Sequence, residues 1–331
     1  MKSFVINEND SGQRLDKYLL KSLPALPKGL LYKYVRIKRI KVNGKRAEIS
    51  AKLNNGDVVD MYINDEFFEN NEENLDFLEA SNEINIIYED DNVLIIDKGV
   101  GLLSHPDKGE YIDTLITRVK RYLYEQGCYN PKEENTFSPA LANRIDRNTR
   151  GLVIAAKNAK ALRILNEKIK VRQIHKFYLC IVDGNPSKGT KSSDNWILLD
   201  GWIKKDENKN TVYVNNKSFD GAKPIETKYK VIATKSNLSL VEVDLLTGRA
   251  HQIRAHMASI GNPLLGDNKY GHKHENKRLG YNKQFLCSYR LEFDFTDDAD
   301  ILNYLNGKSF EIKNIEFVND FYNGNLGSKS V

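Results

Sequence analysis

One carboxylate stands out in this sequence because of its neighbours. Asp146 lies in the polar stretch 143–151, which also holds three arginines and runs directly into the apolar segment 152–156. The apolar, β-branched run predicts a buried strand, whereas the stretch before it is too polar for the core and too short for a linker. The sequence therefore predicts a loop that presents one carboxylate at the mouth of a buried strand.

A lone carboxylate among arginines has two ordinary interpretations. It forms a structural ion pair, or it acts on an electron-deficient centre such as the sugar carbon of a glycosidic bond. Residue types alone favour the ion pair. A second cationic segment, residues 245–257, is predicted to end one strand and to open a helix. We expect these two loops to close one site.

Four sequence blocks, in order and spacing, resemble the RluA family of RNA pseudouridine synthases. Residues 143–151 match the core motif His-Arg-Leu-Asp-x-x-Thr-Ser-Gly, with Asp146 on the family's catalytic aspartate. The other blocks are LIIDKGVGLLSHP at 94–106, KFYLCIVDG at 176–184 and LLTGRAHQIRAHMASIGNPLLGDNKYG at 245–271. The similarity covers residues 84–295. It implies an isomerase that converts uridine to pseudouridine in RNA.

The resemblance implies roles for individual residues. Asp146 would be the catalytic carboxylate, and Tyr178 would lie against the flipped target base, offsetting part of the cost of flipping; a half-buried core tyrosine is the alternative. Arg249 holds the Thr-Gly-Arg position, and we expect its guanidinium to grip both oxygens of Asp146, with Arg254 as the next candidate. Arg144 would fill space near the vacated base, or else contact phosphate.

Four positions depart from the family pattern, and none removes the aspartate. Asn143 replaces His, Ile145 replaces Leu, Arg150 replaces Ser, and Gly99 stands where Pro is usual. Asn143 can still close the loop with a hydrogen bond. Arg150 adds charge near the site, and we expect it to affect which RNA is accepted.

Residues 12–63 read as a small basic module. Helices are predicted at 14–20 and 29–37, Asn43-Gly44 predicts a hairpin turn within 40–46, and 56–59 a closing strand. The module resembles an S4 RNA-binding domain; a merely solvated basic surface is the alternative. Its expected RNA-binding residues are Arg36, Lys38, Arg39, Lys41, Lys45 and Arg46.

Charge is distributed unevenly along the chain. The net charge of +5 is weak evidence for nucleic acid, but residues 28–46 hold eight Lys and Arg and no acidic residue, whereas 64–97 hold no Lys or Arg. The acidic, Asn-rich composition of 64–83 predicts a solvated linker. We therefore divide the chain into an S4-like domain at 1–64, a linker at 65–83 and a catalytic domain at 84–325.

The rest of the chain predicts an α+β fold, which the resemblance specifies as a mainly antiparallel mixed sheet. Expected helices lie at 113–125, 159–170 and 250–260, and the tail 324–331 is expected to fray. Expected strands or hairpins lie at 84–97, 177–182, 196–214, 226–233, 238–246 and 285–295.

Several classes of function are disfavoured. No Walker loop, dinucleotide fingerprint or metal-type Cys/His spacing occurs, so we expect no metal or nucleotide cofactor. Cys128, Cys180 and Cys287 are expected to be reduced, the last two in the core, and His105 to be structural. Without a secretory signal or a membrane-length apolar run, we expect a cytoplasmic protein, acting as a monomer.

The predicted activity is pseudouridine synthesis in 23S ribosomal RNA, because the S4-like module typically accompanies ribosomal members of the family. Transfer RNA is the alternative substrate. A non-catalytic RNA chaperone or ribosome assembly factor is a second hypothesis, given modest support by Asn143 and Arg150. A nucleoside or glycoside hydrolase lacks a clear second carboxylate. The sequence leaves open whether Asp146 attacks C1′, attacks the base or deprotonates C2′.

Overall fold

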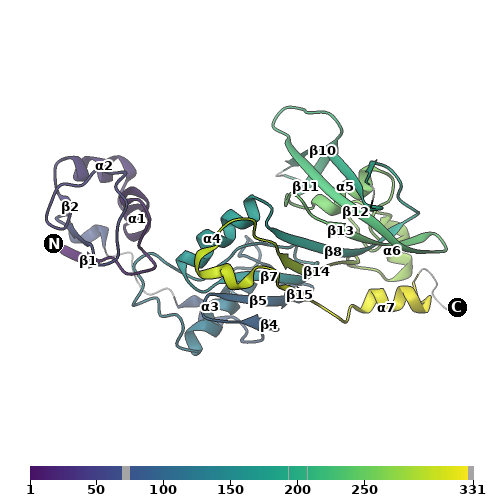
Figure 1. Cartoon of the computed structure of the whole chain (residues 1–331), viewed down its shortest axis with the longest axis horizontal. Helices are drawn as coiled ribbons and strands as arrows, with labels where there is room; N and C mark the ends of the chain where they lie inside the picture. The colour runs from purple at the N-terminus through teal and green to yellow at the C-terminus, as the bar shows by residue number, and fades with distance from the viewer. Residues whose placement is uncertain (69–74, 193, 207, 327–331) are drawn as a thin grey trace.

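The computed structural model describes residues 1–68, 75–192, 194–206 and 208–326. A small module of two helices and three strands lies at one end, and a large sheet with its helices makes up the remainder (Figure 1). Parts of the predicted linker (69–74), hairpin tip (207) and tail (327–331) lie outside the described residues.

The N-terminal module packs two helices on a three-stranded sheet of order β1-β3-β2. Leu15, Leu19 and Leu31 from the two helices are fully buried against the sheet. The predicted helices and closing strand are confirmed. The elements are β1 (Lys2–Val5), α1 (Leu15–Ser22), α2 (Lys28–Arg36), β2 (Ile40–Val42) and β3 (Val58–Met61).

The hairpin predicted at 40–46 is only partly present. Asn43 and Gly44 form the turn, with φ of 53° and 69°, but a single bridge from Val42 to Lys45 follows it. The strand β2 instead pairs antiparallel with β3. Turn chemistry is local, whereas the partner is selected by burial of Ile40 and Met61 in the module core.

The large sheet runs β11-β10-β12-β13-β8-β14-β7-β5-β4, with β15, β6 and β9 attached to β14, β7 and β10. Among the described residues, β14 and β7 are its one parallel pair, so the predicted mainly antiparallel mixed sheet is confirmed. The strands are β4 (Ile86–Glu89), β5 (Val93–Lys98), β6 (Ala140–Leu141), β7 (Arg150–Ala156), β8 (Ile174–Asp183), β9 (Thr190–Lys191), β10 (Ile197–Asp206), β11 (Thr211–Asn215), β12 (Lys223–Lys235), β13 (Leu238–Asp244), β14 (Leu286–Phe293) and β15 (Ser309–Glu311).

Alternate residues of the central strands enter two apolar cores, one on each face of the sheet. On β7, Val153 joins the core beneath α3 and α5, and Ile154 joins the opposite core with α4. The buried strand predicted after Gly151 is thus confirmed. The helices are α3 (Leu115–Glu125), α4 (Ala159–Lys170), α5 (Gln252–Ser259), α6 (Lys273–Leu279) and α7 (Glu316–Asn323), with short 3-10 helices η1 (Asp65–Phe67), η2 (Asp76–Glu79) and η3 (Asp300–Leu305).

The parallel contact between β7 and β14 depends on one glycine. Gly151 has φ of 141°, and a Cβ atom built there would lie 2.3 Å from the carbonyl oxygen of Ser288. No side chain fits this approach. Gly151 therefore ends the polar stretch and lets β7 enter the sheet beside β14.

A polar interface joins the N-terminal module to the large sheet. The fully buried side chain of Asp10 accepts hydrogen bonds from Thr136 Oγ1 and, at 2.8 Å, from Asn135 Nδ2. Asn9 Nδ2 donates to Glu134 at 2.5 Å. These contacts connect segments 125 to 126 residues apart in the chain. The domain limits at 64, 84 and 325 stay predictions.

Candidate active site

Asp146 lies where the two predicted loops meet. Its side chain is 25% exposed, and Oδ2 accepts a hydrogen bond of 3.0 Å from Nη1 of Arg254. No hydrogen-bond partner for Oδ1 occurs in the part of the chain that the structure describes. One carboxylate oxygen is thus held by the protein, and the other is left for a ligand.

A second carboxylate holds Arg254 in place. Arg254 donates from Nε to Asp267 Oδ2 at 2.7 Å and from Nη2 to Asp267 Oδ1 at 3.0 Å, while Nη1 points to Asp146. Burial alone would lower the pKa of Arg254, but the hydrogen bonds and charges of Asp267 and Asp146 raise it. The side chain of Asp267 is 0% exposed. A planar guanidinium fixed on one edge in this way has a defined direction for its remaining nitrogen.

The prediction that Arg249 grips Asp146 is wrong. The helix α5 begins at Gln252 and not at residue 250, so Arg249 precedes it; its side chain is exposed and its backbone N–H donates to Gln252 Oε1 at 3.1 Å. His251 has a left-handed backbone, with φ of 54°, and this delays the helix. Arg254, in the first turn of the helix and buried, makes the pair instead.

His251 and Tyr270 complete the wall beside the carboxylate. His251 Nε2 lies 3.9 Å from Asp146 Oδ2, and Nδ1 lies 2.8 Å from the hydroxyl of Tyr270. Burial lowers the pKa of His251, outweighing the opposite effect of Asp146. Arg254 supplies a permanent positive charge next to Asp146.

Tyr178 lies in the core next to the site. It is on β8 with 4% of its surface exposed, and burial raises the pKa of its hydroxyl, with a smaller contribution from the charge of Asp146. Its ring packs in the apolar cluster beneath α5. The structure thus brings Tyr178 near Asp146, and stacking against a base stays a prediction.

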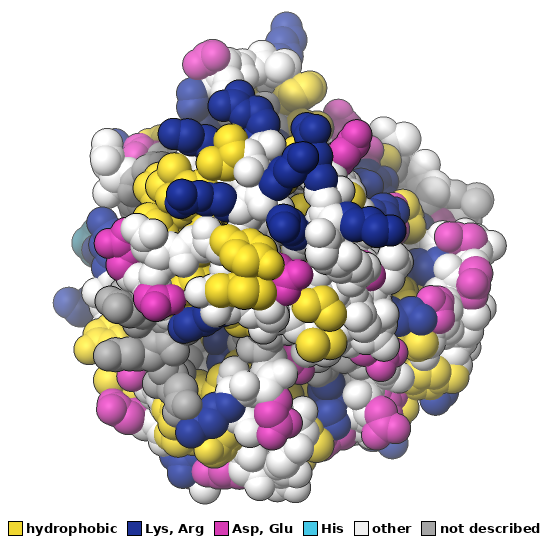
Figure 2. Space-filling view, turned by 90° about the vertical axis from the view of Figure 1, so that its left-hand side faces the viewer, with side chains coloured by type: hydrophobic (Ala, Val, Ile, Leu, Met, Phe, Trp, Pro, Cys, Tyr) yellow, Lys and Arg dark blue, Asp and Glu magenta, His cyan; other side chains and the backbone are white. Residues whose placement is uncertain are grey.

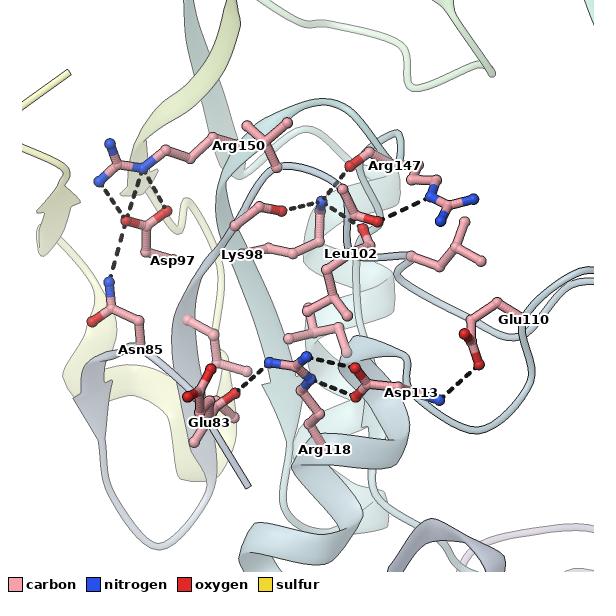
Figure 3. Close-up of a pocket in the computed structure, with 17 residues that line it drawn as sticks. Glu83, Asn85, Asp97, Lys98, Leu102, Glu110, Asp113, Arg118, Arg147 and Arg150 are labelled. Carbon is pink, nitrogen blue, oxygen red and sulfur yellow. Dashed lines mark hydrogen bonds and ion pairs between the residues drawn. The ribbon is translucent and has the colours of Figure 1, made fainter. Parts of the chain in front are cut away.

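The backbone on both sides of Asp146 is braced from behind by the loop after β5. Ser104 Oγ donates to the carbonyl of Ile145 at 2.9 Å. Lys98 Nζ donates to the carbonyl of Arg147 at 3.2 Å (Figure 3). Lys98 also donates to the carbonyls of Gly99 and Leu102. Burial lowers the pKa of Lys98 to about 7, against the opposing charges of Asp146 and Asp97.

Three of the four departures from the family pattern have structural explanations. Asn143 closes the loop as predicted: its Oδ1 accepts from the backbone N–H of Ile154 at 2.8 Å. Ile145 is buried in the core. Arg150 pairs with Asp97, Nη2 to Oδ2 at 2.8 Å (Figure 3). Its charge is therefore already matched.

The predicted RNA-binding residues are accessible. Arg144 is exposed on the loop that carries Asp146. Burial, together with the positive charge of Arg144, lowers the pKa of His105. Arg36, Lys38, Arg39, Lys45 and Arg46 are exposed, and Lys41 is half-buried. Lys and Arg side chains gather in the upper half of the face that carries this module (Figure 2).

The structure also bears on the cysteines, on membrane-spanning helices and on metal ligands. Cys180 and Cys287 are buried free thiols, as predicted, and Cys128 is exposed. No described helix is long and apolar enough to span a membrane. Within residues 1–68, 75–192, 194–206 and 208–326, no group of three His, Cys, Asp or Glu is placed to hold a metal ion.

Comparison with known proteins yields a consistent result. The family model described as RNA pseudouridylate synthase matches residues 92–259, and that of the S4 domain matches residues 13–59. An uncharacterised RNA pseudouridine synthase of Mycoplasma genitalium is 32% identical over 296 residues, 88% of each chain. The ribosomal large subunit pseudouridine synthase C of Haemophilus influenzae is 32% identical over 313 residues, 92% of this chain and 90% of its own.

A solved structure shares the fold. Human RNA pseudouridylate synthase domain containing 4 superimposes with a TM-score of 0.52 and 21% identity over 70% of this chain and 89% of its own. At this identity the likeness supports the fold alone. It agrees with the α+β architecture and large, mainly antiparallel sheet described above.

Proposed function

Because the chain belongs to the RNA pseudouridylate synthase family, we propose that it modifies specific uridines of 23S ribosomal RNA and that Asp146 is its catalytic carboxylate. The protein is an isomerase that converts uridine to pseudouridine in RNA. One observation supports the assignment of Asp146. The guanidinium of Arg254 is held by Asp267 through Nε and Nη2, and its Nη1 donates a hydrogen bond to Asp146.

The geometry of the site supports separate roles for the two carboxylate oxygens of Asp146. Arg254 fixes Oδ2 of Asp146, so Oδ1 is the atom available to act on the flipped nucleoside, at C1′, at the base or on the C2′ proton. Breaking the bond from C1′ to N1 leaves the sugar electron-deficient, and rejoining C1′ to C5 of the turned uracil conserves every atom. The reaction therefore needs no redox partner.

Ribosomal RNA is the favoured substrate for two reasons. Relatives from Haemophilus and Vibrio species that align with most of this chain are named ribosomal large subunit pseudouridine synthase C. An S4 domain precedes the catalytic domain, with the division at 1–64, 65–83 and 84–325 kept as part of the proposal. Such a substrate places the protein in the cytoplasm. Asp146, Arg254 and Asp267 all come from one chain, which supports action as a monomer.

The decisive experiment compares Asp146→Asn with the wild type. We expect the variant to lose pseudouridine formation while its RNA affinity changes by no more than a few-fold, because the amide keeps the shape but neither attacks carbon nor takes a proton. The product is measured by mapping pseudouridines in ribosomal and transfer RNA from cells that lack the gene and carry either version.

Each result has a clear meaning. Restoration of a 23S site by the wild type alone supports the proposal. Turnover by a folded Asp146→Asn variant would remove Asp146 from the mechanism, and a restored site only in transfer RNA would replace the substrate. No restored site with either version would favour a non-catalytic RNA-binding role.

A further inference from the structure

The N-terminal module carries positive charge that is not paired with carboxylates of the described residues. Its segment 28–46 contains eight Lys and Arg residues, and none of them forms an ion pair with a carboxylate of the described chain. Elsewhere, cations such as Lys157, Arg118 and Arg150 pair with acidic side chains. Unmatched charge at this density is stabilised by binding a polyanion.

Two tyrosines on the same module are exposed beside these cations. Tyr32 on α2 is 38% exposed, and Tyr62, just after β3, is 41% exposed. The ammonium groups of Lys28 and Lys41 lie 5.9 and 5.1 Å from the centroids of the respective rings. Neither hydroxyl has a hydrogen-bond partner within the residues that the structure covers, so side-chain bonds do not explain these tyrosines.

The sheet register places Tyr62 inside the basic surface. Its backbone N–H donates to the carbonyl of Arg39 at 2.7 Å, and Lys41 opposes Asp60 two residues before it. Arg39, Lys41, Asp60 and Tyr62 therefore share the solvent face of this sheet, because partners in an antiparallel ladder point the same way. On this end of the molecule, side chains coloured as hydrophobic lie between Lys and Arg side chains (Figure 2). The hydrophobic colour includes tyrosine.

We propose that the N-terminal module binds an unpaired RNA segment by stacking bases on Tyr32 and Tyr62, with Lys28 and Lys41 contacting the adjacent phosphates. In a duplex the base faces are covered by their neighbours, so a duplex uses the lysines but not the rings. A partly exposed aromatic ring with an ammonium over it offers a stacking surface for the base and a positive charge for the phosphate of one unpaired nucleotide. The proposal rests on the proposed function only in taking RNA as the ligand.

The test measures binding of the full chain to a labelled 12-nucleotide single strand and to the same strand in a duplex. We expect Tyr32→Ala and Tyr62→Ala each to weaken single-strand binding roughly five- to 150-fold, the loss of one stacked base. Duplex affinity should stay within about twofold, and the salt dependence should not change because no charge is removed. Tyr→Phe variants, which keep the ring, should bind as the wild type does.

A matched control is Tyr213→Ala, since Tyr213 is 52% exposed on β11, away from the basic module. The proposal is overturned if neither alanine variant weakens single-strand binding, if both weaken duplex binding equally, or if Tyr213→Ala has the same effect. Pseudouridine formation at saturating enzyme is measured in parallel. If the wild-type protein forms no pseudouridine, the proposed function is contradicted. The binding result still tests the role of the two tyrosines.

Discussion

Arg254 and Arg150 of the large domain differ from the arginines and lysines of the N-terminal module in what surrounds them. Arg254 pairs with two carboxylates and Arg150 with one, and both are at least partly buried. The cations of residues 28–46 have no carboxylate partner in the described chain and are mostly exposed. Paired arginines fix the positions of other groups, while unpaired ones remain available to phosphate. The same residue types thus serve geometry in one region and attraction in the other.

Replacing Arg254 by lysine keeps the positive charge but removes the planar guanidinium that contacts both carboxylates. In Arg254→Lys, one ammonium cannot bridge Asp267 and Asp146 as the guanidinium does. Because displacement of a reacting group by about 1 Å can cost on the order of a hundredfold, we expect turnover to fall by about that factor with RNA affinity nearly unchanged. Single-turnover rates at saturating enzyme measure it. The exposed Arg249→Lys is the control, and a loss of equal size there would contradict the assignment of the pair.

Neutralising Arg36, Lys38 and Arg39 together tests whether the unpaired cations of the N-terminal module contact phosphate. If each contacts a phosphate, the slope of log affinity against log salt should flatten by about 2, at roughly 0.7 per charge for single strands. The single-turnover rate at saturating enzyme should be unaffected. Neutralising Lys160 and Lys170, which pair with Asp300 and Glu167, should barely alter the slope. Equal slopes for both variants would show that unpaired cations contact RNA no more than paired ones do.

Arg150→Ser tests whether a paired arginine near the site serves stability rather than RNA choice. The change leaves the buried carboxylate of Asp97, whose side chain is 3% exposed, without its main partner. We expect a loss of about 1–3 kcal/mol in the free energy of unfolding, the usual cost of an unsatisfied buried group. The set of modified uridines should be the same. A changed set with unchanged urea unfolding would mean that Arg150 contacts RNA.

The smallest expected effect concerns the interface that joins the two regions. Burial raises the pKa of Glu134 above its ordinary value of 4.5, and the charge of Asp10 adds to this, against hydrogen bonds from Asn9 and Asn7. A raised carboxyl pKa contributes stability that is present below the unfolded-state pKa and is lost as pH rises through the folded-state pKa. Glu134→Gln should flatten that decline, by less than about 1 kcal/mol, in urea unfolding from pH 4 to 7. An unaltered pH profile would count against a buried, ionisable Glu134.

Local signals in the sequence predicted most of the fold. Helices α1, α2, α3 and α4 and the β10–β11 and β12–β13 hairpins follow from apolar spacing and turn residues, and the structure confirms them. The partner of β2 was not predictable from the Asn43-Gly44 turn, because pairing with β3 is selected by burial in the module core.

The sequence predicted the two loops of the site but not which arginine pairs with Asp146. Asp146 lies in the predicted loop and pairs with an arginine of the second cationic segment. That arginine is Arg254 and not Arg249, because His251 adopts a left-handed backbone that residue spacing does not reveal. The role of Tyr178, which is buried on β8, stays a prediction. Asp267 lies within a recognised block, yet nothing local marks it as the anchor of Arg254. Tyr270 and Ser104 act through tertiary contacts and were missed for the same reason.

The fork joining Asp146, Arg254 and Asp267 also sets an order of events during synthesis. Asp146 and Arg254 are 108 residues apart, and Asp267 follows 13 residues later. At about 5–20 residues per second, the carboxylate leaves the ribosome roughly 5–20 s before the arginine that aims it. The N-terminal module, complete by then, presents its basic surface first. A nascent chain of this protein is therefore equipped to hold RNA before it is equipped to change it.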